Sequence, residues 1–397
     1  MRGKKLFVTG VMTGTSSDGL DLCLLSIPGG DSRSWIVEAF GSFSFTKETA
    51  NLILSCQETE VLNKKEYVAF SGKIAQFAAT RVRKFLEEHF HGKVPTQLAV
   101  AYHGQTIGHF PEKRRIGKRG YSGTLQAGEA AMIAEITGRT TVSDFRQADV
   151  ASGGEGAPLT PLFHAPLLAG NNGVNAFLNV GGIGNISVVE KGKILAATDT
   201  GPGNILIDGA VRLFSGGNRK FDRDGRWGKK GSVSDRLLAF LRAQDHFLKR
   251  KKPASTGREQ YGRSFLDGLV KESDKIGISE ADVISTLTFY TAFCVSEYLK
   301  KNGYGKIRKV YVGGGGASNS LFMDMLSSLL VEIDVVTSSS LGIPPGYVEA
   351  AAMAYLGYLC LAGISVDTSA FTGGGKGILG KITPETNFPS LMNAIHG

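Results

Sequence analysis

The sequence has few cysteines, no compact metal-binding pattern and no extended apolar run. Its cysteines lie far apart and form no CxxC pair: Cys23, Cys56, Cys294 and Cys360. A disulfide-stapled secreted fold and a structural zinc site are therefore not expected, and the reducing cytoplasm is the expected compartment. We expect no signal peptide, because polar Thr9 and Gly10 follow the first short apolar run at once. The most apolar stretch, 350–366, has interior glycines and predicts a buried helix rather than a membrane span.

The charge excess is moderate and is not gathered in one block. Lys and Arg number 45 against 36 Asp and Glu, a formal net charge of +9. The surplus lies in three short runs, 113–119, 219–230 and 249–263, and no arginine-rich tail is present. A solvated loop is the better interpretation of each run. We therefore expect neither a nucleic-acid nor a membrane partner.

Length and composition favour two globular domains. The chain has 397 residues, 42% of them hydrophobic, which is longer than one core usually serves. Glycine is unusually frequent, at 53 residues without a Gly-X-Y period, and this indicates tight turns or close backbone approach to a ligand. Short β-branched runs alternate with helical patterns, which predicts an α/β fold.

The two halves of the chain follow a similar plan. The first has strands at 5–12 and 20–27 around a glycine-rich turn, then a helix at 63–90 and strands at 98–103 and 140–145. The second has strands at 174–180, 186–189 and 193–197 around another such turn. A helix at 279–302 and a strand at 309–312 follow. We expect a duplicated architecture, with one domain at 1–147 plus 375–397 and the other at 148–374.

The first glycine-rich turn carries hydroxyl and carboxylate side chains. An Asp-Gly hairpin needs nothing more to form, so a plain turn is one interpretation. The other is a phosphate site, in which backbone N–H groups and hydroxyls bind oxygens and Mg²⁺ separates the acids from the phosphate. Asp18 would hold this Mg²⁺, directly or through a water. The turn consists of Gly14, Thr15, Ser16, Ser17, Asp18, Gly19, Leu20 and Asp21.

Two further glycine clusters lie in the second half. No Walker-type P-loop occurs, and the cluster at 313–319 lacks the third glycine of a dinucleotide-binding fingerprint. The first cluster has the same backbone character as the turn at 14–21 without its acids, and its candidate nucleotide-binding residues are Gly181, Gly182 and Asn185. The second cluster contains Gly313, Gly314, Gly315 and Asn319.

Asp199 is the strongest candidate for catalysis. It precedes Thr-Gly-Pro-Gly-Asn, and a carboxylate at a strand end beside a glycine-lined site can act as a general base. The alternative is that Asp199 caps the next helix or braces the turn.

A polar segment between the halves offers substrate contacts. Arg146 could bind a substrate carboxylate through its planar fork, or form an ion pair with Asp144 or Asp149. Gly154 lies in a run that frees the backbone to wrap a ligand or to act as a hinge. His103 follows a strand and could simply be a hydrogen-bonded strand end. Glu349 opens a helix and could act only on the helix dipole.

Eight motifs in one order resemble the anhydro-N-acetylmuramic acid kinase family over nearly the whole chain. They are GTSSDGLD (14–21), HGQT (103–106), DFRQADVASGGEGAPLTP (144–161), NVGGIGN (179–185), DTGPGN (199–204), STGRE (255–259), GGGGASN (313–319) and EAAAMA (349–354).

The resemblance implies a two-domain actin-like, hexokinase-like ATPase fold with an interdomain nucleotide cleft. It implies a kinase that uses ATP and water to open an anhydro amino sugar and phosphorylates O6, giving N-acetylmuramic acid 6-phosphate in cell-wall recycling. Asp199 then is the base for water and Glu349 a second active-site carboxylate. The turn at 14–21 is then the phosphate loop, and the nucleotide-binding residues Gly313, Gly314, Gly315 and Asn319 form part of the nucleoside pocket. Substrate contacts fall on His103, Asp144, Arg146 and Gly154. A homodimer is also implied.

The sequence departs from the family pattern at Glu155, where glutamine is usual, and at Gln260, which separates the GRE segment from Tyr261. A carboxylate at 155 would repel the lactyl acid of the substrate. Two other functions stay open at this point: an ATP-switched regulator of the same fold, and a kinase for a different sugar.

Overall fold

The computed structural model of the chain describes residues 5–14, 19–28, 34–59, 61–250, 254, 256–302 and 307–396. Its contacts divide the chain into two units. Unit 1 comprises Met1–Phe163 and Glu349–Gly397, and unit 2 comprises His164–Val348. The domain limits proposed from the sequence lie at other positions, 147/148 and 374/375, and remain a prediction for the limits of independent folding.

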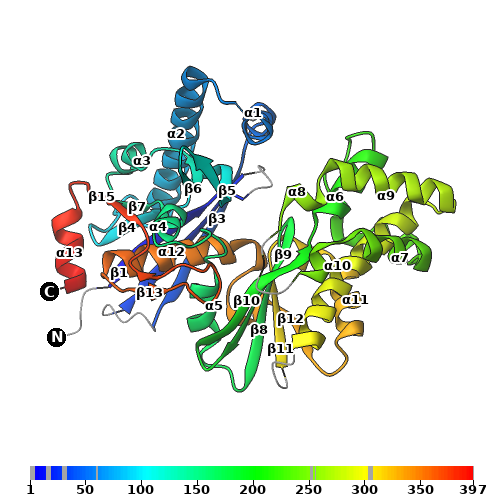
Figure 1. The fold of residues 1–397 in the computed structure, drawn as a ribbon. Coiled ribbons are helices and arrows are strands. Elements are labelled where there is room, and N and C mark those ends of the chain that lie inside the picture. Colours follow the sequence, from blue (N-terminus) through cyan, green and yellow to red (C-terminus); the bar gives the residue numbers. More distant parts are fainter. Residues whose placement is uncertain are drawn as a thin grey trace. The chain divides into compact units, whose positions relative to one another are not determined.

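Unit 1 is built on a six-stranded sheet with the order β15-β7-β4-β1-β2-β3 (Figure 1). Strands β1, β2 and β3 form an antiparallel meander, β4 and β7 run parallel to β1, and β15 closes the edge antiparallel to β7. The bounds are β1 Leu6–Met12, β2 Gly19–Ile27, β3 Ile36–Ser44, β4 Leu98–Tyr102, β7 Thr141–Ser143 and β15 Lys381–Thr383.

Helices and two small ribbons complete unit 1. Asn63 caps the longest helix by accepting the Lys65 N–H through its side chain, and the buried face of that helix packs against the apolar side chains of β1, β2 and β4. The helices are α1 Lys47–Glu58, α2 Lys64–His89, α3 Ala130–Thr137, α4 Phe145–Ala151, α5 Pro161–Leu168, α12 Val348–Leu361 and α13 Phe388–His396; α5 and α12 run across the unit limits. The ribbons pair β5 Gln105–Ile116 with β6 Arg119–Ala127, and β13 Val366–Asp367 with β14 Lys376–Gly377.

Unit 2 contains a five-stranded sheet with the order β10-β9-β8-β11-β12. Its strands are β8 Val174–Val180, β9 Ile183–Glu190, β10 Lys193–Pro202, β11 Ile307–Gly313 and β12 Asp334–Thr337. Its helices are α6 Ile205–Phe214, α7 Asp235–Gln244, α8 Arg258–Tyr261, α9 Arg263–Ile276, α10 Glu280–Asn302 and α11 Ser320–Leu329. Short 3₁₀ turns are η2 Arg223–Gly225, η3 Gly228–Lys230, η4 Phe247–Lys249, η5 Gly315–Ser318, η6 Ser338–Leu341 and η7 Pro345–Tyr347.

The two sheets share one topology, and this confirms the duplicated plan expected from the sequence. In each unit three antiparallel strands are followed by two strands parallel to the first, and the spatial order of these five strands is third, second, first, fourth, fifth. Parallel strands need a crossover, and helices supply it in both units.

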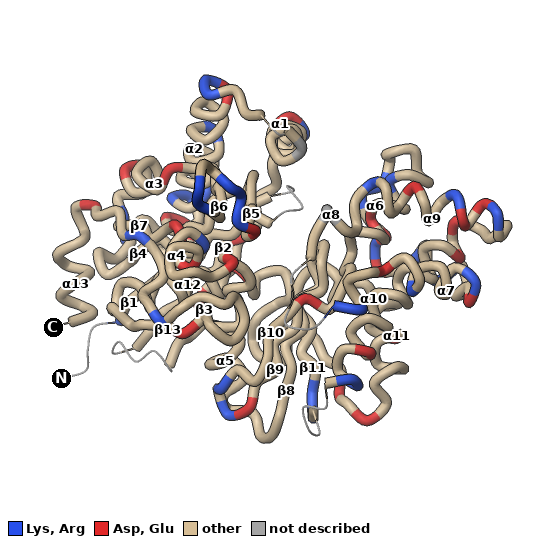
Figure 2. The backbone as a smooth tube through the Cα atoms, in the orientation of Figure 1, with Lys and Arg blue, Asp and Glu red and all other residues tan. Residues whose placement is uncertain are grey.

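Two local expectations were wrong. The strand expected at 140–145 ends at Ser143, because Asp144 adopts a left-handed conformation with φ 58° and Phe145 begins α4. The run 113–119, expected to be a loop, forms the ends of β5 and β6 and the turn between them. The tip is solvated as expected, and Figure 2 shows Lys and Arg gathered on this ribbon. None of the described helices combines the length and apolar content that a membrane span requires.

The EAAAMA motif lets α12 approach the sheet of unit 1 very closely. A Cβ on Gly10 of β1 would lie 1.9 Å from the Ala350 carbonyl oxygen and 2.5 Å from the Ala354 nitrogen. One turn later, a Cβ on Gly357 would lie 2.4 Å from the Cβ of Ala101 in β4. Glycines and alanines are therefore needed on both sides of this interface, which also sets the position of Glu349 at the start of α12.

Gly10→Ala is expected to lower the free energy of unfolding by about 3 kcal/mol, because the new methyl group pushes α12 away from β1. Gly72→Ala in α2 is the matched control, since the nearest atom to its Cβ is the Met132 Cε at 4.0 Å. There alanine should be neutral or stabilise by up to ~1 kcal/mol. Denaturant unfolding followed by circular dichroism measures both variants, and equal stabilities would contradict this account of the motif.

Candidate active site

In unit 1 the HGQT segment fixes the end of β1 that leads into the first glycine-rich turn. The His103 N–H donates to the Val11 carbonyl at 3.0 Å, and the Thr13 hydroxyl donates to the Gly104 carbonyl at 2.9 Å. The predicted phosphate-binding residues Thr15, Ser16, Ser17 and Asp18 lie outside the described residues. Gly14 precedes them, and Gly19, Leu20 and Asp21 open β2.

His103 is a neutral acceptor for Arg146. Its Nδ1 lies 2.7 Å from the Gly104 carbonyl oxygen, which can only accept, so Nδ1 carries the hydrogen. The Nε2 lone pair then accepts from the Arg146 Nε at 2.8 Å. Burial, followed by the Arg146 charge, lowers the pKa of His103 to about 3. The same causes lower the pKa of the nearby His109 to about 4. Both imidazoles are therefore uncharged at neutral pH.

Arg146 forms no ion pair with Asp144 or Asp149 among the described residues, so that alternative was wrong. Asp144 instead lies 3.7 Å from the Lys381 Nζ. Burial lowers the pKa of Arg146, and the negative charge of Glu349 partly opposes this shift. Apart from Nε, the contact that the guanidinium makes with the described residues is a long one, from Nη1 to the Gly156 carbonyl at 3.4 Å. The cation therefore retains donors for a ligand anion.

Asp149 fixes the glycine-rich segment around Gly154. It is fully buried, and it accepts the Gly156 N–H at 2.8 Å and the hydroxyls of Thr368 and Thr372 at 2.6 and 2.9 Å. A Cβ on Gly154 would lie 2.2 Å from the Asp149 Oδ2. This glycine is therefore required for close approach to a buried carboxylate. Sequence reasoning considered Asp149 only as an ion-pair partner and missed its role in the loop.

In unit 2 Asp199 lies within β10, and its carboxylate is held from two sides. The Asn185 amide donates to Oδ1 at 3.0 Å, and the Thr256 N–H donates to Oδ2 at 2.8 Å. The cap position of the next helix, α6, belongs to Asn204, so Asp199 does not cap it. The STGRE motif thus contributes a hydrogen-bond donor, the Thr256 N–H, to the candidate base.

The second glycine-rich turn joins β8 and β9 to the start of α6. The Gly203 and Ile205 N–H groups donate to the Gly182 carbonyl at 2.9 and 3.0 Å, and the Asn204 N–H donates to the Gly181 carbonyl at 2.8 Å. Gly203 must be glycine, since a Cβ there would lie 2.4 Å from the Gly181 oxygen. The turn that carries Gly181, Gly182 and Asn185 is therefore braced by the DTGPGN segment that contains Asp199.

The third glycine cluster packs on β8 and continues into α11. A Cβ on Gly313 would lie 2.9 Å from the Phe177 ring, and one on Gly314, where φ is 77°, 2.6 Å from the Asn179 Oδ1. Gly315 opens the short turn η5. The Asn319 side chain caps α11 by accepting the Phe322 N–H at 3.1 Å. This capping bond accounts for Asn319 without a ligand, and its amide nitrogen could donate to a nucleotide.

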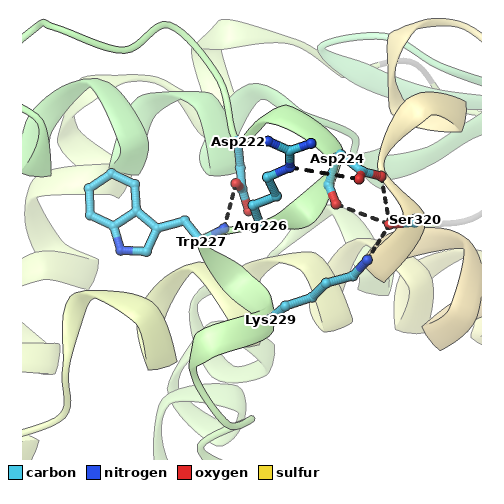
Figure 3. Close-up of polar contacts among 6 residues, drawn as sticks. All are labelled: Asp222, Asp224, Arg226, Trp227, Lys229 and Ser320. Atoms are coloured by element: carbon cyan, nitrogen blue, oxygen red, sulfur yellow. Dashed lines mark hydrogen bonds and ion pairs between the residues drawn. The ribbon is translucent and has the colours of Figure 1, made fainter.

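A basic loop at 222–230 is bonded to the first residue of α11 (Figure 3). The Ser320 hydroxyl donates to the Asp224 Oδ1 at 2.8 Å and accepts from the Lys229 Nζ at 2.5 Å. Asp222 holds the loop by accepting the Trp227 N–H at 2.8 Å. The run expected to be a solvated loop is thus anchored beside the cluster proposed to bind the nucleoside.

The structure brings the candidate residues together in two sets. His103, Arg146 and Glu349 interact in unit 1. In unit 2 Asn185 bonds to Asp199 directly, while Gly181 and Gly182 connect to it through the DTGPGN segment. Neither set includes Asp144, whose charge faces Lys381. The sequence analysis did not identify His109, which lies six residues after His103 and close enough to Arg146 for that charge to add to burial in lowering its pKa.

No cluster of three or more His, Cys, Asp or Glu side chains suited to a metal occurs within the described part of the chain. Mg²⁺ bound with a nucleotide does not need such a cage, because one or two carboxylates and the phosphates suffice. Asp21, opposite Met12 in the β1–β2 ladder, is the described carboxylate of the first hairpin. The donor set is therefore compatible with Mg²⁺.

The comparison with protein families decides the assignment. The model of the family described as anhydro-N-acetylmuramic acid kinase matches residues 6–385. The chain belongs to this family. A kinase of this name from Caldanaerobacter subterraneus subsp. tengcongensis is 36% identical over 359 residues, covering 88% of this chain and 89% of the relative. Another, from Clostridioides difficile, is 33% identical over 389 residues, covering 96% and 99%.

Two solved structures follow a similar course of the chain at low sequence identity. Component A of the (R)-2-hydroxyglutaryl-CoA dehydratase of Acidaminococcus fermentans has a TM-score of 0.46 at 12% identity, covering 89% of this chain and 98% of that one. The activator of the 2-hydroxyisocaproyl-CoA dehydratase of Clostridium difficile, solved with ADPNP, has a TM-score of 0.45 at 12% identity, covering 89% and 94%. Two units, each with a main sheet and helices, agree with the actin-like fold that the sequence resemblance implies.

Proposed function

We propose that this member of the anhydro-N-acetylmuramic acid kinase family performs its reaction with Asp199 as general base. ATP and water convert the anhydro amino sugar to the 6-phosphate and ADP, as part of peptidoglycan recycling. The observation that supports Asp199 is its carboxylate, oriented by the Asn185 amide and the Thr256 N–H and joined to the second glycine turn. A carboxylate oriented in this way can accept a proton from water.

The reaction balances without a further acid. Water attacks the anomeric carbon while its proton passes to Asp199. The bond from that carbon to O6 breaks, and O6 takes the electron pair. O6 then bonds to the γ-phosphorus as the bond to the β-phosphate oxygen breaks. Inverting glycosidases use a carboxylate on water in the same way, but there an acid protonates the leaving oxygen. Here O6, the leaving oxygen, bonds to the phosphoryl group instead of to a proton.

Residues of unit 1 bind the substrates in this proposal. Arg146 pairs with the lactyl carboxylate, and His103, uncharged and bonded to its Nε, orients the guanidinium without adding a competing charge. Glu349 balances the charge of Arg146 and acts as a second carboxylate of the site. The repulsion expected from Glu155 is weakened by solvent, because that residue is exposed.

The first hairpin, Gly14 to Asp21, is proposed to bind the phosphates. Asp18, together with Asp21, would hold Mg²⁺, which when bound neutralises charge on the transferring phosphoryl group. The interdomain cleft, the cytoplasmic location and the homodimer are further expectations from the family.

Release of ADP tests the function against its two alternatives. We expect ADP release to require the anhydro sugar and to yield one sugar phosphate per ADP. A regulator would hydrolyse ATP at the same rate without sugar. A kinase for another sugar would leave the anhydro sugar unchanged and phosphorylate other hexoses instead. Coupled ADP detection with mass spectrometry of the sugar distinguishes the three.

A further inference from the structure

A buried carboxylate with two tyrosines lies in the core of unit 2. Asp245 is fully buried, and its Oδ2 accepts the hydroxyls of Tyr261 and Tyr290 at 2.8 and 2.7 Å. Its Oδ1 accepts the N–H groups of Phe247 and Leu248 at 2.9 and 3.2 Å. No Lys or Arg among the described residues pairs with Asp245, so these four donors alone stabilise it.

Both phenols remain donors at every working pH. Burial is the main cause that raises the pKa of Tyr261 and of Tyr290 far above the usual range, and the charge of Asp245 adds to it. Tyr261 is 2% exposed and Tyr290 is fully buried. A fully satisfied polar network in an apolar core is rigid, because an unpaired member would be costly.

The segment from Ala254 to Tyr261 connects this cluster to Asp199. Beside Asp199, the Thr198 hydroxyl accepts the Ala254 N–H at 2.9 Å, and the Asp199 N–H donates to the Ala254 carbonyl at 3.2 Å. The Thr256 N–H then donates to the Asp199 carboxylate. At the other end the Tyr261 N–H donates to the Gly257 carbonyl at 3.1 Å, which closes α8 onto Gly257.

The Tyr261 hydroxyl also lies against the DTGPGN turn. Gly201 has φ 139°, and a Cβ there would lie 3.3 Å from the Cys294 Sγ and 3.7 Å from the Tyr261 hydroxyl oxygen. Tyr261 thus lies close to the segment that carries Asp199 and also belongs to the one that donates to its carboxylate. Tyr261 is the aromatic residue that follows the GRE segment, with Gln260 between them.

We propose that Asp245, acting through Tyr261, is a positioning residue for the base Asp199. The anchored phenol holds α8 and Gly257 in place, and this keeps the Thr256 N–H directed at the Asp199 Oδ2. Without the anchor the segment moves, the Thr256 N–H no longer donates to Asp199, and the Asp199 carboxylate turns away from the water it should deprotonate. The proposal rests on the role of Asp199 in the proposed function.

Tyr261→Phe tests this with Tyr290→Phe as a matched control. Each variant removes one phenol hydrogen bond to the same oxygen of Asp245, but Tyr290 lies on α10 and does not belong to the 254–261 segment. We expect Tyr261→Phe to lower kcat about tenfold, with the KM values for ATP and sugar within twofold, since a small misplacement of a catalytic group is costly. Tyr290→Phe should keep kcat within twofold. The unfolding temperatures of the two variants should fall by a similar number of degrees.

The outcomes separate this proposal from the proposed function. Equal losses of kcat in the two variants would mean a structural role only, and an unchanged kcat in Tyr261→Phe would also overturn the proposal. Asp199→Asn is measured in parallel. If it is inactive while Tyr261→Phe is normal, only the positioning role fails. If Asp199→Asn keeps the wild-type kcat, the base assignment fails and the positioning role with it.

Discussion

Replacing Asp199 by asparagine is expected to lower kcat about 10³-fold, the middle of the range for a general base. The Asn185 amide and the Thr256 N–H donate to its carboxylate, and an asparagine oxygen can still accept one of these bonds. The side chain therefore stays near its place but can no longer accept a proton from water. The KM for ATP should change less than twofold, because the phosphate-binding turns are untouched.

Asp324→Asn provides the control for this experiment. Asp324 is an exposed carboxylate on α11 of the same unit, and its replacement should leave kcat unchanged. Nucleotide affinity of Asp199→Asn is measured by calorimetric titration with a non-hydrolysable ATP analogue. A variant that binds nucleotide normally and retains the wild-type kcat would show that another group activates the water.

Arg146→Ala is expected to lower kcat/KM for the anhydro sugar about 10²-fold, mainly through KM. The guanidinium is held by the His103 Nε2 and has few other protein acceptors, so a substrate carboxylate would take its remaining donors. Loss of one partner of a desolvated charge pair typically costs about 2–5 kcal/mol. The KM for ATP should not change.

An anhydro sugar without the lactyl group makes this prediction specific. With that substrate, wild type and Arg146→Ala should have the same kcat/KM, because the group that Arg146 binds is missing. Arg114→Ala, an exposed arginine at the tip of the β5–β6 ribbon, should behave as wild type with both sugars. If Arg146→Ala lowers kcat/KM by the same factor with the two sugars, Arg146 maintains the site in another way and does not bind the carboxylate.

The sequence predicted the sheet plan well because the inner strands carry a strong local signal. The runs around β1, β2, β8 and β11 are rich in apolar residues and lie next to glycines, and the structure has strands at each. Edge strand β3 and the β5–β6 ribbon were missed, since their residues are largely polar or half-exposed and neither shows a continuous apolar run. Asp144 ended a strand early through a backbone conformation that no periodicity reveals.

The candidate site was found through motifs, but its contacts could not be derived from them. Asp199 and Thr256 are 57 positions apart, and Asp149 and Thr372 are 223 apart. Only the fold brings these pairs together. The ion pair considered for Arg146 was wrong for the same reason: neighbours in sequence, Asp144 and Asp149, point to Lys381 and to buried hydroxyls instead. Tyr261 was noticed only as a departure, because its partner Asp245 lies outside every motif.

Solvent oxygen tests the central claim most directly. A single turnover with ATP and the anhydro sugar in ¹⁸O-labelled water is quenched before the anomeric oxygen exchanges, and the product is fragmented in a mass spectrometer. If water attacks the anomeric carbon while O6 receives the phosphoryl group, the sugar 6-phosphate carries one ¹⁸O at that carbon and none in its phosphoryl group. A product without label at the anomeric carbon, or with label in the phosphoryl group, would contradict the account.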